Sequence, residues 1–264
     1  YRTVVLPDYL KQHVDRWGVL PGFGYAKPSG DGYSTQHFSG LVSYSPNEIF
    51  NFQLGKGQHF WGDGYRSNLL SDYANNYPYL KISTKIWKIK YTNLFAQYKD
   101  LSLDPSDPDA YRSKFMASHF LSWNATKKWN FTFFETVIWQ NEDVDRSRGF
   151  DVNYLNPVIF YRPIEFSQGS SDNSIIGAGW KFKGKKNFQL YGQILFDEFL
   201  LSAIKADVQQ FFRPNAVIEE VGWWANKWAF QIGVKAWDAF QVEGLTDTQR
   251  PDDLSPAAAR HYPA

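Results

Sequence analysis

The feature that most constrains the fold is a repeated alternation of apolar and polar residues. An extended strand points successive side chains to opposite faces, so this period of two predicts strands with one apolar and one polar face. The segments that show it are His37 to Ser45, Ile49 to Lys56, Tyr79 to Trp87, Ile89 to Tyr98, Ser113 to Trp123, Trp129 to Gln140, Ser174 to Lys183, Phe188 to Glu198 and Ala225 to Trp237, with Val242 to Gln249 as a further partner for the last. The chain is therefore predicted to be all-β.

The connections between these segments alternate between short and long. Short connections fall near 45–48, 87–88, 124–128 and 184–187, and long ones cover 57–78, 99–112, 141–173 and 199–224. An antiparallel up-and-down transmembrane β-barrel has short periplasmic turns and long extracellular loops in this order. Tryptophans near the short turns would form a periplasmic-side girdle: Trp87, Trp123, Trp129 and Trp180.

Composition agrees with a wall that is apolar on one side. Aromatic residues make up 19% of the 264 residues, yet the mean hydropathy is negative. No apolar run is long enough for a membrane-spanning helix, which leaves a barrel possible. The net charge of +1 gives no reason to expect nucleic acid, and the absence of Cys excludes disulfides and thiolate chemistry. A soluble β-sandwich or lectin-like barrel stays open as the alternative fold.

The chain is divided into an irregular N-terminal segment (1–36) with a short helix at Asp8 to Val19, a barrel domain (37–249) and an irregular C-terminal segment (250–264). About ten to thirteen strands can be counted, so the barrel in this chain is expected to be incomplete. Because the sequence begins at Tyr1 without Met or a signal peptide, we expect a mature or partial form.

The long connection from Phe60 to Asp72 is unusually rich in rings and charges. Besides the Gly, Asn and Ser that turns require, it carries Trp61, Tyr65, Arg66 and two aspartates. Aromatic rings beside paired polar groups suit a flat, hydroxyl-rich ligand such as a sugar. The alternative is a loop that buries its own rings.

Two other segments resemble it in composition. One runs from Tyr154 to Asn173, and the other is Gly222 to Lys227 with two adjacent tryptophans. If all three lie at one mouth of the barrel, they would form a carbohydrate platform. Alternatively they fold inward and plug the lumen, through an ion-pair network of Arg66, Arg162, Glu165 and Asp172.

Three carboxylates interrupt the pattern. Glu135 falls on the apolar face of its strand, which requires either a bulge or an error of register, and we expect the latter. Asp197 and Glu198 are adjacent on a strand and so point to opposite faces, which makes them a poor acid/base pair. The five histidines are not at metal-ligand spacing, and no nucleophile elbow is present.

Several motifs together resemble the Wzi-like capsule assembly family of outer-membrane β-barrel proteins. They are Trp61-Gly62-Asp63-Gly64, Ser67-Asn68-Leu69-Leu70-Ser71-Asp72, Leu155-Asn156-Pro157, Ser171-Asp172-Asn173, Gly192-Gln193-Ile194-Leu195-Phe196-Asp197-Glu198-Phe199 and Gly222-Trp223-Trp224-Ala225-Asn226-Lys227. The resemblance runs from about residue 37 to about 237. It implies a barrel of about eighteen strands that holds or assembles surface polysaccharide without catalysing a reaction. After Trp237 the family's late strands cannot be matched.

The sequence therefore predicts a non-enzymatic protein of a Gram-negative outer membrane that binds capsular polysaccharide. Its partners would be the polysaccharide, outer-membrane lipid and other outer-membrane proteins, with no nucleic acid, cofactor or metal. The predicted ligand-binding residues are Trp61, Asp63, Tyr65, Arg66, Asp72, Asn156, Arg162, Glu165, Trp223 and Trp224. The alternatives are a structural accessory subunit of a secretion or gliding complex, and a hydrolase that uses Asp197 or Glu198.

Overall fold

The protein is mostly antiparallel β-sheet, as predicted. The computed structural model describes residues 2–4, 6–100, 112–143, 146–158, 172–184, 188–197, 209–210, 212–213 and 227–237. Within this part of the chain, no helix has the length and apolar character needed to cross a membrane.

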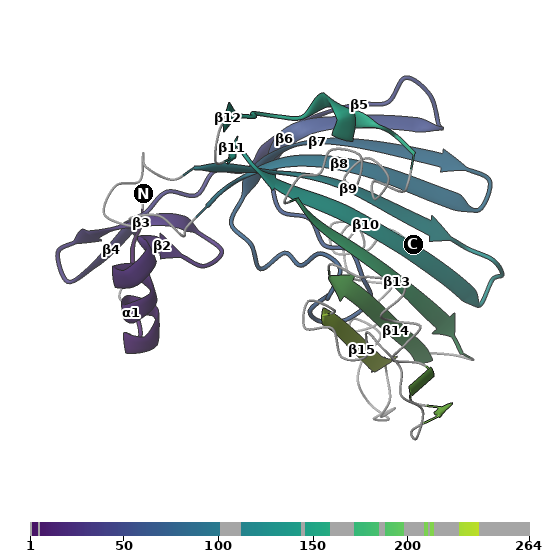
Figure 1. Ribbon diagram of the computed structural model, residues 1–264. Helices are drawn as coiled ribbons and strands as arrows, with labels where there is room; N and C mark the ends of the chain where they lie inside the picture. The colour runs from purple at the N-terminus through teal and green to yellow at the C-terminus, as the bar shows by residue number, and fades with distance from the viewer. Residues whose placement is uncertain are drawn as a thin grey trace, which may run out of the picture.

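Nine strands form one large sheet in which every neighbouring pair is antiparallel. The strand order is β15-β14-β13-β10-β9-β8-β7-β6-β5, so each strand lies beside the next large strand along the chain. The bounds are β5 Gly40–Tyr44, β6 Phe50–Gly57, β7 Tyr77–Ile86, β8 Ile89–Lys99, β9 Ser113–Trp123, β10 Trp129–Gln140, β13 Asn173–Lys183, β14 Phe188–Asp197 and β15 Lys227–Ala236. The sheet is strongly curved and resembles an open trough (Figure 1).

Nine of the ten predicted strands are confirmed, and their short turns have identifiable causes. Asn47 Oδ1 accepts hydrogen bonds from the backbone N–H groups of Ile49 (3.0 Å) and Phe50 (2.9 Å), which fixes the turn before β6. Thr126 Oγ1 accepts from Lys128 and Trp129 in the same way before β10. Trp87 adopts a positive φ of 52° in the two-residue turn between β7 and β8.

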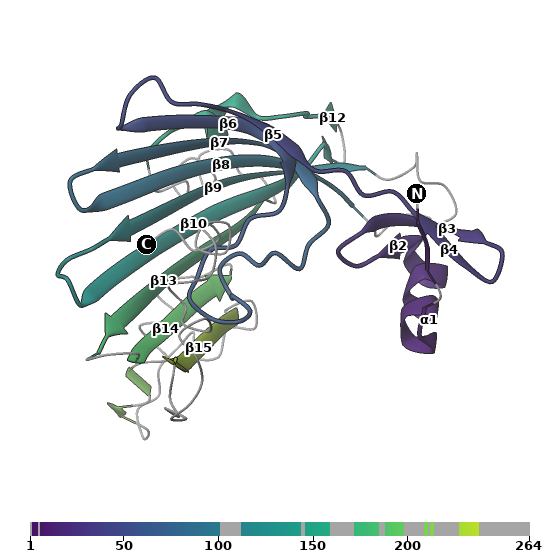
Figure 2. The ribbon, with the colours of Figure 1, turned by 180° about the vertical axis from the view of Figure 1, so that it is seen from behind.

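The two faces of the sheet differ in chemistry. Residues paired across strands share a face, so the register sorts the side chains. One face carries apolar rows such as Leu54, Leu80 and Phe95, or Phe133, Ala178, Ile194 and Phe230. The other carries rows such as Gln53 with Lys81, or Thr132, Gly179, Gln193 and Gln231. The second face lines the hollow of the trough, because its Lys181 and Gln193 contact residues 58–76, which Figure 2 shows in that hollow.

The described strands do not close into a barrel. β5 and β15 stand at the two ends of the strand order, and no pairing joins them within the described residues. The predicted strand at 242–249 and the C-terminal segment 250–264 lie outside the described residues. The sheet is thus an open antiparallel meander.

The N-terminal residues, predicted to be irregular apart from a helix, form a small unit of their own. Helix α1 (Asp8–Trp17) packs on a four-stranded sheet of order β1-β4-β3-β2, with bounds β1 Arg2–Val4, β2 Val19–Leu20, β3 Gly24–Ser29 and β4 Gly32–Thr35. Val14, Leu20 and Ala26 meet in its core. The strands are too short for alternation to be read, which is why the sequence did not predict them. We call residues 2–35 the N-terminal unit.

Two long connections return to the large sheet, one on each face. Residues 58–76, here called the inner segment, lie in the hollow of the trough (Figure 2). Residues 148–158, here called the cover segment, include the 3-10 helix η1 (Val152–Leu155) and lie on the convex face (Figure 1). A two-stranded ribbon of β11 (Glu142–Asp143) and β12 (Arg146–Ser147) precedes the cover segment.

Candidate functional site

The inner segment is held as a compact loop by its own backbone. Trp61 N–H donates to the carbonyl of Leu70 at 2.9 Å, and the two residues form an isolated antiparallel bridge. The hydroxyl of Ser67 donates to the carbonyl of Trp61 and accepts from the N–H of Leu69. These bonds close the loop around Gly62 to Arg66 and present that part of it as a fixed tip.

Trp61 anchors the inner segment in the hollow. Its ring stacks on Phe120 of β9 at 5.0 Å between centroids and meets the edge of Phe134 of β10 at 5.9 Å. Only 9% of the residue is exposed, and Leu69 packs in the same core cluster. The ring that the sequence assigned to a sugar is therefore occupied by packing.

Polar side chains of the sheet fix the rest of the segment. The Lys181 ammonium lies 2.9 Å from Asp63 Oδ1, and Gln189 Nε2 donates to the same oxygen at 3.3 Å. Gln193 Oε1 accepts from the hydroxyl of Ser67 and the N–H of Asn68. Asp63 thus connects the loop to two strands, β13 and β14. Its two partners lie on the polar face that the alternation predicts.

Gly62 is required at the point of closest approach. Its φ is 139°, and a Cβ there would lie 2.2 Å from Ser67 Oγ and 2.3 Å from Gln193 Nε2. Both the backbone conformation and the available space therefore exclude a side chain. The glycine of the Trp-Gly-Asp-Gly motif serves to dock the loop on the sheet.

The tip of the inner segment exposes an aromatic and cationic surface. The Arg66 guanidinium lies 5.1 Å from the ring centre of Tyr65 and 4.5 Å from that of Tyr73. Tyr65 is 87% exposed, and Tyr73 is also exposed. Gln231 Nε2 donates to the carbonyl of Arg66 at 3.0 Å, which holds the backbone while the side chain projects. Asp72 is exposed nearby in sequence. We call Tyr65, Arg66 and Tyr73 the tyrosine–arginine group.

The remaining predicted residues do not join this group within the described part of the chain. Asn156 lies in the cover segment, where its carbonyl is 3.0 Å from His119 Nε2. The predicted convergence of its segment with the inner segment at one mouth is therefore wrong for Asn156, because residues after β10 fold back over the convex face. Arg162, Glu165, Trp223 and Trp224 lie outside the described residues.

The cover segment explains why Glu135 can lie on the apolar face of its strand. Glu135 pairs in register with His119 on one side and Ile176 on the other, without a bulge, so it does lie on the convex face. The expected error of register was wrong. His119 Nδ1 lies 3.5 Å from Glu135 Oε2, and both side chains are at most 2% exposed. The cover segment shields this pair, so the carboxylate does not face the surroundings of the sheet.

An ion-pair network ties the cover segment down. The Arg148 guanidinium donates to Asp151 (2.8 Å) and Asp172 (2.6 Å), and the Tyr154 hydroxyl donates to Asp172 (2.6 Å). Burial alone would lower the pKa of Arg148, but its hydrogen bonds to the two carboxylates raise it above the ordinary value. Burial would raise the pKa of Asp151, and the hydrogen bond from Arg148 outweighs this and lowers it. Asp172 therefore pairs with Arg148 in this structure.

One histidine of the inner segment is buried as a neutral group. Burial, together with the charge of Lys81, lowers the pKa of His59 to about 3. Its Nδ1 lies 3.1 Å from the Tyr77 hydroxyl, and its ring meets the edge of Tyr79 at 4.2 Å. Among the described residues no His, Asp or Glu group of three has metal-binding geometry. His59 therefore helps to pack the inner segment against β7.

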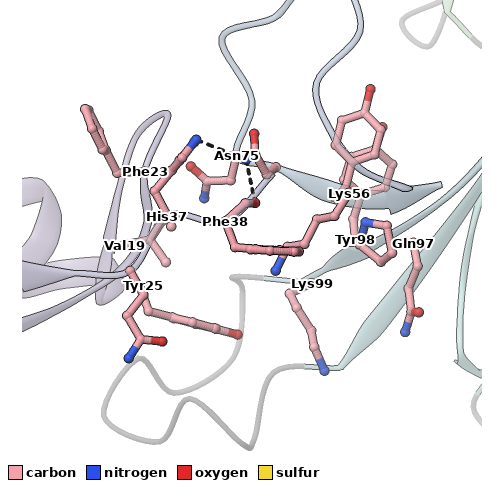
Figure 3. A pocket seen from close by; sticks show the side chains of 15 residues that line it. Val19, Phe23, Tyr25, His37, Phe38, Lys56, Asn75, Gln97, Tyr98 and Lys99 are labelled. Carbon is pink, nitrogen blue, oxygen red and sulfur yellow. Dashed lines mark hydrogen bonds between the residues drawn. The ribbon is translucent and has the colours of Figure 1, made fainter. Parts of the chain in front are cut away.

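Sequence reasoning missed a cavity between the N-terminal unit and the large sheet. It has a volume of about 420 Å³ and is lined by aromatic, amide and lysine side chains (Figure 3). We call it the N-terminal cleft. Its residues come from segments far apart in sequence, and none forms a motif, so no local signal could have revealed it.

Comparison with known proteins gave no match for this chain. No family model matches it, and no curated protein or solved structure is similar to it. The function must therefore be argued from the geometry described above.

Proposed function

We propose that the protein is an outer-membrane β-barrel protein of a Gram-negative bacterium that holds surface polysaccharide without catalysing a reaction. The resemblance of its motifs to the Wzi-like capsule assembly family leads to the same proposal. The support comes from three features of the described residues, taken in turn below.

The chemistry of the two faces supports the membrane location. Large apolar residues on the convex face are exposed in the single chain, among them Leu54 (65%), Phe230 (63%) and Ile232 (71%). A soluble sheet would bury such a surface, whereas lipid solvates it without cost. The polar concave face would then line the lumen, with the inner segment as its plug.

Aromatic residues near the short turns support the same orientation. Trp129 of β10 stacks with Phe131 (5.9 Å) and contacts Phe182 (4.8 Å), and Trp123 lies 6.1 Å from Phe131. All four residues share the convex face, where an interfacial girdle would lie. The short-turn end would therefore face the periplasm, and the long connections would face the outside.

The proposal that the ligand is a polysaccharide rests on the tyrosine–arginine group. Two exposed rings stacked about one guanidinium offer faces for pyranose rings and a donor for hydroxyl or carboxylate oxygens. Trp61, Asp63 and Gly62 hold the loop that presents them, so little ordering free energy would be lost on binding. An ordered loop built only for packing would not need Tyr65 to be 87% exposed.

Removing the two rings tests this function. In cells that carry Tyr65→Ala with Tyr73→Ala, we expect polysaccharide binding to weaken about tenfold, because two stacking contacts of about 0.5–1.5 kcal/mol are lost. The measurement is the surface polysaccharide retained on washed cells, with the amount of inserted protein determined in parallel. Tyr9→Ala on α1 is the matched control, since Tyr9 is a 70% exposed tyrosine away from the inner segment. Full retention with normal insertion of the double variant would contradict the proposal.

A further inference from the structure

A group of lysines on the concave face has no role in the proposed function. It consists of Lys81 and Lys85 of β7 and Lys90 of β8, which lie between the inner segment and the short turns. Lys81 pairs in register with Gln53, and Lys90 pairs with Ser122, so these side chains share the polar face of the sheet. We call Lys81, Lys85 and Lys90 the lysine group.

The members of the lysine group repel one another. Lys85 lies directly opposite Lys90 in register, and the positive charge of Lys90 acts in turn on Lys81. Like charges directly opposite each other destabilise a sheet. Lys81 and Lys90 are also half-buried, so water screens their repulsion less than it would at an open surface. The stability of the sheet therefore does not account for this arrangement.

No carboxylate neutralises the lysine group in the described part of the chain. Among the residues of β5 to β10 the one carboxylate is Glu135, which lies on the convex face beside His119. Asp63 of the inner segment pairs with Lys181 of β13. Within the described residues, no ion pair joins a member of the lysine group to an acidic side chain. The charge of the group is therefore available to a ligand.

Two hydroxyl groups lie between the lysines. Ser83 and Thr92 pair in register on the same face, with Lys85 and Lys90 two residues away on one side and Lys81 on the other. Two residues of a strand span about 7 Å, so the long flexible lysine side chains reach the space above the hydroxyls from both sides. The hydroxyls and ammonium groups therefore offer hydrogen-bond donors to one point.

The inner segment borders this space. Phe120, on which Trp61 stacks, is the partner of Thr92 in register, and Leu94, the partner of Lys81, packs in the same core cluster as Trp61. The inner segment lies in the hollow of the trough (Figure 2), so the lysine group faces that hollow as well. A concave surface lined by one sign of charge concentrates ligands of the opposite sign.

From this arrangement we propose that the lysine group, with Ser83 and Thr92, binds a phosphate group that is either free or attached to a sugar. Lysine ammonium groups are compact point charges that suit phosphate, whereas a planar carboxylate is matched by the fork of an arginine. The tetrahedrally arranged oxygens would accept from the ammonium groups on both sides and from the hydroxyls beneath. The site goes beyond the proposed function, because it is separate from the tyrosine–arginine group.

Titration with small phosphate compounds tests the inference. The full chain in micelles of a non-ionic detergent is titrated by calorimetry with inorganic phosphate, glucose 6-phosphate and glucose. We expect at least one of the two phosphates to bind more tightly than glucose, with an affinity that falls as salt rises because ion pairs are screened. The comparison of inorganic phosphate with glucose 6-phosphate distinguishes the two sources of the phosphate group.

Lysine variants assign the binding to this group. Lys85→Gln with Lys90→Gln should weaken phosphate binding about tenfold, because each partly exposed ion pair contributes less than a factor of ten. The same variant removes the repulsion across the pair, so its thermal unfolding midpoint should rise. Lys85→Arg with Lys90→Arg keeps both charges and should keep the binding. Lys127→Gln with Lys128→Gln, in the neighbouring short turn, is the matched control and should change nothing.

A measurement on the parent protein keeps the inference testable if the variant does not fold. Phosphate should slow the acetylation of Lys81, Lys85 and Lys90, followed by mass spectrometry, and leave that of Lys127 unchanged. The inference is overturned if neither phosphate binds more tightly than glucose, if binding survives Lys85→Gln with Lys90→Gln, or if phosphate does not slow acetylation of the lysine group. The retention assay on Tyr65→Ala with Tyr73→Ala decides the proposed function separately.

Discussion

At the scale of the residue, neighbouring aromatic side chains of the inner segment differ in role: one is buried in the sheet and others are exposed. Trp61 is buried between Phe120 and Phe134, whereas Tyr65 and Tyr73 project. Trp61 and Tyr65 were both predicted to bind a ligand, and Tyr73 was not. The difference in burial arises from contacts with strands more than fifty residues away, which no local pattern reports.

The buried histidine of the inner segment gives a pH dependence with a defined sign. The folded pKa of His59 is about 3 against an ordinary 6.5, so between these values the unfolded chain binds more protons than the folded one. The stability of the segment's docking is therefore complete above about pH 6.5 and decreases as the pH falls, by up to about 1.4 kcal/mol per pH unit. Hydrogen exchange at the amide of Trp61, corrected for intrinsic rates, measures this opening.

Two variants make the assignment specific. His59→Gln should remove the acid dependence because glutamine does not titrate, and His13→Gln on α1 should leave it as in the parent protein. If the protection of Trp61 were independent of pH between 7 and about 4 in the parent protein, the burial of neutral His59 would not contribute to docking.

At the scale of the element, the strands were predictable because alternation is a property of neighbouring residues. β9 (Ser113–Trp123) and β10 (Trp129–Gln140) have the bounds that the sequence predicted. The long connections were not predictable, since each is placed by pairs distant in sequence. Asp63 forms an ion pair with Lys181 on the concave face, and the carbonyl of Asn156 contacts His119 on the convex face. The composition of those connections indicated that they are ordered but not where they go.

The cover segment depends on a buried ion pair, which allows a sharp test. Arg148→Gln should leave the Asp172 carboxylate, 4% exposed, without its charged partner. Breaking a buried pair costs about 3–5 kcal/mol, so residues 148–158 should exchange amide hydrogens much faster. Hydrogen exchange with mass spectrometry on this peptide is the measurement.

Arg112→Gln is the matched control for that change. Arg112 lies 3.1 Å from Glu142, but the two side chains are 50% and 44% exposed, so the loss should be at most about 1 kcal/mol. Equal exchange in the two variants would mean that the Arg148–Asp172 contact does not hold the cover segment.

At the scale of the whole molecule, one curved sheet presents two faces of different chemistry. The convex face is mostly apolar, with buried polar side chains at Asn93, His119 and Glu135, and the cover segment lies there. The concave face carries polar rows and holds the inner segment through Asp63 and Gln193, beside the apolar cluster around Trp61. The cover segment shields the buried polar pair on the convex face, and the inner segment bonds to polar side chains of the concave face. The proposed wall between lipid and a plugged lumen would need this arrangement.

The most direct test of this central claim is the accessibility of adjacent residues in a bilayer. Because the chain has no cysteine, single spin labels can be attached at Gln53 or Leu54 of β6 and at Phe230 or Gln231 of β15. In lipid vesicles, labels at Leu54 and Phe230 should collide with lipid-soluble oxygen. Labels at Gln53 and Gln231 should instead be shielded from oxygen and be relatively more accessible to a water-soluble nickel chelate. Equal accessibility of each adjacent pair, or the reverse assignment, would contradict a sheet with lipid on its convex side.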